Sequence, residues 1–471
     1  MALLSAGGTV GTMPRTLLAA ATAAAALALA APAGAASFGS PGLGDPFFPL
    51  AGNGGYDVGH YALTLDYKRT GNRLEGSATV SATATQALDR FDLDLRGFAI
   101  SRLEVNGRPA AFTRDGQELR ISPRGRLAAG SAFTVRVDYA GTPAVVTDPD
   151  GSIEGWVPTD DGAIVVNEPQ GSPAWFPVND NPRDKATYDF AITVPQGITA
   201  LANGVLVSSA TSGEKTTWRW RETDPMASYL ATATNGRFDL SQQTGPNGLP
   251  IYNAVDSGLN PKRKATAKAL LSQAPEIVEF FGDLYGAYPF NAAGGIIDPA
   301  PDVGYSLETQ TKPNYAYVPD ELTVVHELSH MWFGDAVTLT EWPDIWVHEG
   351  FATFSEWIWR ERHGGESAQA TFDRLYADKQ FPWSPAPAAL QRPSQLFSTP
   401  VYDRGGMTLQ ALRVKVGDAT FFRILRDWYA QNRYGNVTTA EFIALAEAES
   451  GQDLDAFFQA WLFTPSKPAS W

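Results

Sequence analysis

Residues 323–333 read Thr-Val-Val-His-Glu-Leu-Ser-His-Met-Trp-Phe, with His326 and His330 four positions apart. On an α-helix, residues i and i+4 lie on one face, so both rings can point at one metal ion, and zinc is the usual occupant of this pattern. Glu327 points to an adjacent sector, which suits a carboxylate that acts on water rather than on the metal. The alternative is an amphipathic surface helix that carries two ordinary histidines.

Two observations favour the metal site over the surface helix. The chain has only 5 histidines, and two of them fall here at ligand spacing. Eighteen residues separate His330 from Glu349, which lies in a stretch (residues 346–352, Trp-Val-His-Glu-Gly-Phe-Ala) that indicates a second helix. A third ligand on a following helix leaves one coordination position open, which is the arrangement of catalytic zinc sites.

Composition restricts the class of protein. A chain of 471 residues with 44% hydrophobic and 11% aromatic content predicts two or three packed domains. The formal net charge of −15 argues against nucleic acid as a partner. The chain has no cysteine, which excludes disulfides, thiolate ligands, a cysteine nucleophile and a lipid anchor on an N-terminal cysteine.

The first 35 residues have the pattern of a signal peptide. Arg15 precedes an apolar run at residues 17–31, and Ala33-Gly34-Ala35 is a small-x-small cleavage site. The apolar run is too short for a comfortable membrane span, so we expect an exported, secreted protein without a membrane anchor. Residues 36–55 are rich in glycine and proline and are expected to be a flexible leader.

Hydrophobic periodicity divides the rest of the chain. From residue 56 to 243 the dominant period is two, as in Tyr61, Leu63, Leu65 and Tyr67, which predicts an antiparallel, β-sandwich-like domain. From residue 244 to 471 the period approaches 3.6, which predicts a mainly helical domain in an α+β protein. Asn260-Pro261 is a helix start, and one helix is predicted over residues 261–285.

The ligand set and its spacing resemble the gluzincin metallopeptidases, and the M1 aminopeptidases in particular. Two further segments support this resemblance, namely Trp332-Phe333-Gly334 and residues 346–352. The family usually has Asn where this chain has His348, so His348 is an alternative third ligand to Glu349. The resemblance implies a thermolysin-like catalytic domain that binds one Zn²⁺ per chain. It covers nearly all of the chain after residue 56, in a compact two-domain form.

Three further segments resemble family motifs, and the resemblance implies a role for one residue in each. Residues 305–309 are similar to the Gly-x-Met-Glu-Asn motif, which implies that Glu308 binds the free N-terminus of a peptide. Glu168-Pro169, followed by Phe176-Pro177, resembles the family segment that supplies an acidic or amide side chain to the active site. The resemblance implies that Glu168 lies at the same site as Glu308. Residues 402–407 resemble the segment that holds the catalytic tyrosine, here Tyr402.

These matches imply a zinc aminopeptidase with Glu327 as general base and peptides with a free N-terminus as substrates. An endopeptidase of the thermolysin type would use the same ligands. A binding or scaffold protein with a decayed site is a third reading, against which the intact ligand set argues. Hydrolysis of a lipid epoxide is a fourth reading that no sequence feature favours. A metal-bound histidine normally donates its other ring N–H to a carboxylate or a carbonyl group. The candidate carboxylates for this role are Asp335, Asp344 and Glu356.

Overall fold

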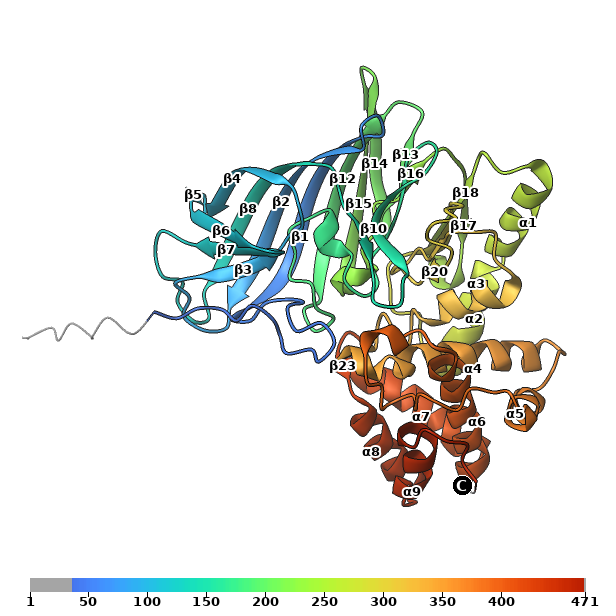
Figure 1. The fold of residues 1–471 in the computed structure, drawn as a ribbon. Helices are drawn as coiled ribbons and strands as arrows, with labels where there is room; N and C mark the ends of the chain where they lie inside the picture. The colour runs from blue at the N-terminus through green and yellow to red at the C-terminus, as the bar shows by residue number, and fades with distance from the viewer. Residues whose placement is uncertain (1–35, 470–471) are drawn as a thin grey trace, which may run out of the picture. The chain divides into compact units, whose positions relative to one another are not determined.

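An eight-stranded sheet forms the framework of the N-terminal half (Figure 1). The computed structural model describes residues 36–469, so the predicted signal peptide lies outside the described residues. Along β1, Tyr61, Leu63, Leu65 and Tyr67 are buried at every second position, as the period of two predicts. In spatial order the strands are β14 (Val205–Ser212), β15 (Lys215–Met226), β12 (Ala186–Pro195), β1 (Tyr56–Lys68), β2 (Arg73–Ala84), β8 (Ala132–Gly141), β4 (Ala99–Val105) and β5 (Arg108–Pro109).

A small sheet covers one face of this framework. It consists of β3 (Phe91–Asp94), β7 (Glu118–Ser122) and β6 (Ala111–Asp115). Phe91 packs its ring 5.7 Å from that of Tyr56 and 5.1 Å from that of Phe133, measured between centroids. The two sheets therefore share one apolar interior, and the predicted sandwich-like half of an α+β fold is confirmed. Within the eight-stranded sheet one pairing is parallel, that of β1 with β12.

Two further sheets lead from the first half to the second. The first is ordered β13 (Thr199–Ala200), β16 (Asn235–Gly236), β11 (Ala163–Val166), β10 (Ile153–Pro158) and β9 (Val145–Thr147). The second is ordered β17 (Phe238–Thr244), β18 (Pro250–Asp256), β19 (Ala293–Ile297), β21 (Asn314–Tyr315) and β20 (Ser306–Leu307). The predicted domain boundary at 243/244 falls inside β17, which pairs with β18.

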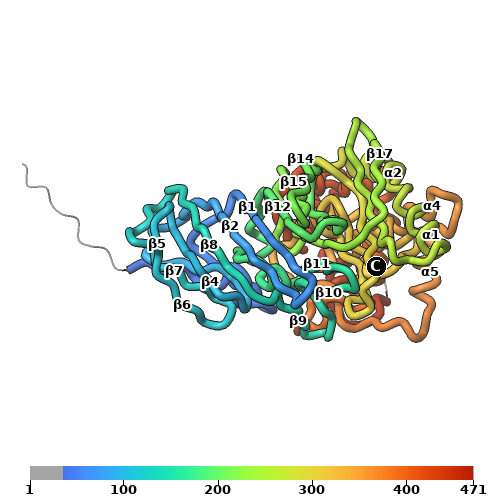
Figure 2. The backbone as a smooth tube through the Cα atoms, turned by 90° about the horizontal axis from the view of Figure 1, so that it is seen from above, coloured from blue at the N-terminus to red at the C-terminus, as the bar shows by residue number. Residues whose placement is uncertain are grey.

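The second half is mainly helical, as predicted, with a short parallel pair of strands, β22 (Thr338–Leu339) and β23 (Asn436–Val437). In Figure 2, helices α1, α2, α4 and α5 gather at the end opposite β5–β7. Among the described residues, none of the helices is long and apolar enough to cross a lipid bilayer. The α-helices are α1 (Pro261–Leu271), α2 (Ala274–Tyr285), α3 (Glu321–Ser329), α4 (Trp346–Arg362), α5 (Ala368–Ala377), α6 (Gly405–Val416), α7 (Asp418–Asn432), α8 (Thr439–Ser450) and α9 (Asp455–Phe458).

The single helix predicted over residues 261–285 is wrong, because the chain breaks between α1 and α2. Pro275 has no N–H to donate to the carbonyl of Leu271, four residues earlier. That carbonyl instead accepts a hydrogen bond from Asn253 Nδ2 at 3.0 Å. The start of the helix is as predicted, with the Asn260 side chain accepting from the N–H of Arg263.

Candidate active site

Helix α3 presents His326 and His330 on one face. Its first turn is capped by Asp320, whose side chain accepts the N–H of Thr323 at 2.8 Å. His330 follows the last helical residue, yet its N–H still donates to the carbonyl of His326 at 3.2 Å. The i, i+4 relation predicted from sequence therefore holds at the end of the helix, and the two rings lie with centroids 4.8 Å apart.

Glu349, in the first turn of α4, brings one carboxylate oxygen to both rings. Its Oε2 lies 3.1 Å from Nε2 of His326 and 3.4 Å from Nε2 of His330. Ligand atoms of the three residues all lie within 4.8 Å of one another. Although burial alone would raise the pKa of Glu349, the charges of His330 and His326 hold it well below the ordinary range.

The far nitrogens of both rings have partners of their own. His326 Nδ1 lies 2.6 Å from Glu356 Oε1, and His330 Nδ1 lies 3.0 Å from the carbonyl oxygen of Phe333. A ring whose Nδ1–H donates outward leaves the Nε2 lone pair facing inward, which is how zinc-binding imidazoles are held. Two imidazole nitrogens and one carboxylate oxygen fit zinc with an open fourth position.

The alternative ligand His348 is used elsewhere. Its Nε2 accepts the backbone N–H of Leu339 at 2.7 Å, so that lone pair is occupied. Two other sets of residues around this site also bring ligand atoms within 4.8 Å, namely Glu308–Glu327–His330 and Glu168–Glu308–His348. Each of these sets has only one imidazole, whereas the set with Glu349 has two, and zinc sites of this class favour nitrogen ligands.

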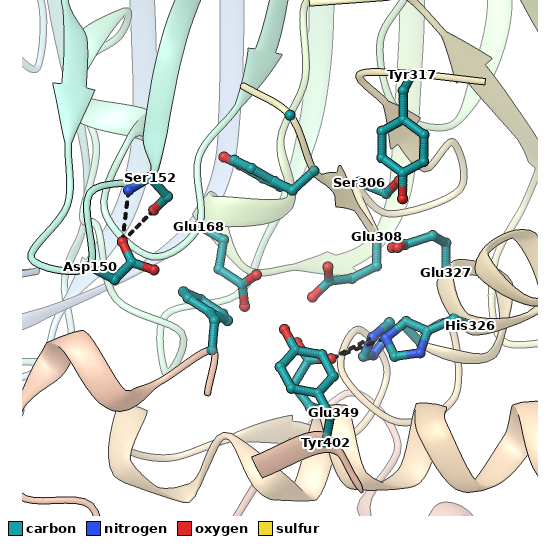
Figure 3. Close-up of a pocket in the computed structure, with 14 residues that line it drawn as sticks. Asp150, Ser152, Glu168, Ser306, Glu308, Tyr317, His326, Glu327, Glu349 and Tyr402 are labelled. Atoms are coloured by element: carbon teal, nitrogen blue, oxygen red, sulfur yellow. Dashed lines mark hydrogen bonds and ion pairs between the residues drawn. The ribbon is translucent and has the colours of Figure 1, made fainter. Parts of the chain in front are cut away.

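A cavity of about 350 Å³ opens beside the three ligand residues (Figure 3). Glu327 lines it next to His326, and burial raises the pKa of Glu327 to about 8 against the opposing charges of the two histidines. The sequence predicted no role for the other seven lining residues, which are Asp150, Ser152, Gly304, Tyr305, Ser306, Tyr317 and Phe397.

Glu168 and Glu308 face each other across this cavity. Glu168 follows β11 and Glu308 follows β20, and their carboxylate oxygens lie within 4.8 Å of each other. Both side chains are buried, and in each the Oε1 atom has no hydrogen-bond partner among the described residues. Burial raises the pKa of both carboxyls, and the charge of Glu308 raises that of Glu168 further. Two such groups favour a cationic ligand between them.

Tyr402 reaches the same cavity from the π-helical turn Pro400–Arg404, directly before α6. Its ring lies nearly parallel to that of His326, with centroids 6.0 Å apart and an interplanar angle of 24°. Arg404, two residues later, is fully buried and donates to the carbonyls of Trp461, Ala460 and Thr464 at 2.9, 3.0 and 2.6 Å. These bonds tie the Tyr402 turn to the end of the described chain.

Of the three candidate supporting acids, the structure places only Glu356 against a ligand ring. Asp344 instead accepts from the hydroxyl of Thr439 at 2.6 Å, at the start of α8. Asp335 is buried with both carboxylate oxygens free of hydrogen bonds to the described residues. A sequence signal for Glu356 existed, since it lies seven residues after Glu349, on the same face of one helix.

The two-layer β half, the helical half and the His–His–Glu group with its open position define the fold and site of a zinc metallopeptidase. The sequence matches the descriptions "Peptidase M1 N-terminal domain" over residues 58–230 and "Peptidase family M1 domain" over residues 307–461. The chain belongs to peptidase family M1.

Relatives of known type agree with this assignment. Aminopeptidase N of Streptomyces lividans is 24% identical over 445 residues, which is 86% of this chain and 50% of the relative. Glutamyl aminopeptidase of Rattus norvegicus is 25% identical, over 85% of this chain and 46% of the relative. The chain thus spans about half the length of these relatives.

Solved structures match over their whole length. An M1 zinc metallopeptidase mutant from Deinococcus radiodurans, bound to a Tyr-Ser-Ala substrate, is 29% identical with a TM-score of 0.83, over 91% of this chain and 100% of that chain. A two-domain M1 zinc metallopeptidase mutant bound to L-tryptophan is 28% identical with a TM-score of 0.82, with the same coverage.

Proposed function

We propose that this chain is a zinc-dependent aminopeptidase that removes N-terminal residues from peptides. The observation that supports this most strongly is the Glu168–Glu308 pair, whose buried and unpartnered oxygens face the cavity beside the ligand group. A free peptide N-terminus is an ammonium ion, and these carboxylates would hold it by charge-assisted hydrogen bonds. A chain interior brings no charge to this place and would leave the carboxylates desolvated without a partner.

Each remaining residue has one role in the proposed reaction. His326, His330 and Glu349 would hold the zinc, which supplies a Lewis acid that polarises the scissile carbonyl and acidifies water. Glu327 takes a proton from the attacking water and returns it to the leaving amine. Tyr402 donates its hydroxyl to the oxygen of the scissile carbonyl as negative charge develops there.

Substitution of Glu327 tests the zinc-hydrolase half of this proposal. Glu327→Gln should bind zinc as the wild type does and lose about 100- to 10,000-fold in kcat on an aminoacyl reporter, because it removes the general base and keeps the ligands. Wild-type activity should disappear with a chelator and return with zinc. A fully active Gln variant, or turnover that a chelator does not affect, would contradict the mechanism. Cleavage of an internally quenched, N-blocked peptide in place of the reporter would indicate an endopeptidase instead.

We also propose that the protein is exported. The support is the pattern of residues 1–35 alone: Arg15, the apolar run at 17–31 and the Ala33-Gly34-Ala35 site. Mass spectrometry of the protein produced with its full N-terminus should find a mature chain that starts after Ala35 in the extracellular fraction. Full-length protein retained inside the cell would contradict export.

A further inference from the structure

The cavity beside the ligand group is rich in carboxyl groups. Its lining includes five carboxylates, and no lysine or arginine is among the described residues that form it. The proposed function uses four of these carboxylates and leaves Asp150 without a role. Carboxylates that gather in a concave site attract cationic ligands.

A tight turn between β9 and β10 fixes Asp150. The N–H of Gly151 donates to the carbonyl of Asp148 at 2.9 Å, and the N–H of Asp148 donates to the carbonyl of Ser152 at 3.0 Å. Oδ1 of Asp150 accepts both the N–H and the hydroxyl of Ser152, at 2.9 and 2.7 Å. Oδ2 takes part in no hydrogen bond or ion pair found among residues 36–469, so it is available to a ligand.

This turn is tied to the elements that carry Glu168 and Glu308. Tyr305, three residues before Glu308, donates its hydroxyl to the carbonyl of Ile153 at 3.0 Å. Gln170, two residues after Glu168, donates from Nε2 to Oδ1 of Asp148 at 3.0 Å. The position of Asp150 relative to the Glu168–Glu308 pair is therefore set by hydrogen bonds on both sides.

Asp150 lines the part of the cavity that lies away from His326 (Figure 3). Figure 3 shows Glu168 between Asp150 and Glu308, with His326 beyond Glu308 and Glu349 below it. With the ammonium at the Glu168–Glu308 pair and the scissile carbonyl at the ligand group, a first side chain that runs away from His326 would reach Asp150. The half-buried rings of Tyr305 and Phe397 line the same cavity and suit the long methylene stem of a lysine or arginine.

We propose that Asp150 makes this cavity select peptides whose N-terminal residue is lysine or arginine. The inference rests on the proposed aminopeptidase function and names its substrate class. Oδ2 of Asp150 pairs with the cationic head of the first side chain, while Glu168 and Glu308 hold its α-ammonium. Because Asp150 is exposed, the pair is screened by solvent and its effect is a preference rather than an absolute requirement.

The test compares lysyl and norleucyl reporters, which share a stem and differ in the terminal ammonium. In Asp150→Asn, the ratio of kcat/KM for lysyl over norleucyl should fall about three- to fivefold. Asp150→Lys should lower the ratio further. Asp160→Asn is the matched control, because it removes the same charge from the exposed turn between β10 and β11, outside this cavity, and it should keep the wild-type ratio.

A second measurement needs no variant. Raising the ionic strength from about 0.05 to 0.5 M should lower the wild-type lysyl-to-norleucyl ratio, because an exposed ion pair is screened by salt. An unchanged ratio in Asp150→Asn, with norleucyl turnover retained, overturns the inference and leaves the aminopeptidase proposal standing. If the zinc-loaded wild type cleaves neither reporter, the aminopeptidase proposal itself fails and the inference falls with it.

Discussion

Gly350 in α4 and Gly405 in α6 lie backbone against backbone: a Cβ added to Gly405 would sit 2.8 Å from Cα of Gly350. Glu349 is the residue before Gly350, and Tyr402 lies three residues before Gly405. The close approach of the two helices therefore sets the distance between a proposed zinc ligand and the proposed catalytic tyrosine.

Gly405→Ala should destabilise the protein by about 1–2 kcal/mol, because the methyl group meets backbone that cannot rotate away, and this outweighs the better helix propensity of alanine. Chemical denaturation measures the change. Gly282→Ala in α2 is the control, since a Cβ there has no neighbour within 4 Å, and it should raise stability by up to about 1 kcal/mol. Equal effects of the two variants would contradict the packing argument.

Glu356→Gln should weaken zinc binding by about 10- to 100-fold, because the carboxylate 2.6 Å from His326 Nδ1 orients that ring and increases its basicity. Competition with a chelator of known affinity measures the change. Asp344→Asn should leave zinc affinity at the wild-type level, since Asp344 bonds Thr439 at the start of α8. If Asp344→Asn weakened zinc binding as much as Glu356→Gln, the assignment of Glu356 would be wrong.

The pair Asp94 and Glu118 makes stability depend on pH. These residues stand opposite each other in the β3–β7 register and both are buried. Burial raises the pKa of both carboxyls, and the charge of Asp94 raises that of Glu118 further. Above the unfolded carboxyl pKa of about 4, the native state then binds more protons than the unfolded state, so stability present near pH 5 is lost as the pH rises through the raised pKa values.

Glu118→Gln should flatten that dependence, because the amide cannot ionise. The measurement is the free energy of unfolding between about pH 5 and pH 9. Glu75→Gln makes the same chemical change on the exposed face of β2 and should keep the wild-type slope. A slope in Glu118→Gln as steep as that of the wild type would remove Glu118 from the explanation.

Much of the architecture could be predicted from local sequence patterns. The period of two along β1 and the Asn260 cap of α1 both depend on neighbours within a few residues, and both are found in the structure. The α1–α2 break was visible as Pro275, but the Asn253 side chain that takes over the Leu271 carbonyl comes from β18. The spacing of apolar residues is unaffected by the missing backbone N–H of Pro275, so periodicity alone predicted one helix over residues 261–285.

The wall of the cavity could not be predicted in the same way. Tyr305 and Ile153 are 152 positions apart in sequence and meet through one hydrogen bond. That contact and the Gln170–Asp148 bond help to hold the Asp150 turn at the cavity, and no periodicity encodes either of them. His326, Glu327 and His330 could be proposed from sequence because one helical turn brings them together. Choosing Glu356 over Asp335 and Asp344 required knowing which acid touches His326.

The central claim is that this site recognises the free start of a peptide, and one ratio tests it most directly: kcat/KM of the zinc-loaded protein for an aminoacyl reporter over that for its N-acetylated form. Acetylation removes the cation that the Glu168–Glu308 pair is proposed to hold, and leaving a buried carboxylate unpaired costs about 3 kcal/mol or more. The account therefore predicts a ratio of about 100 or above. A ratio near one would contradict it.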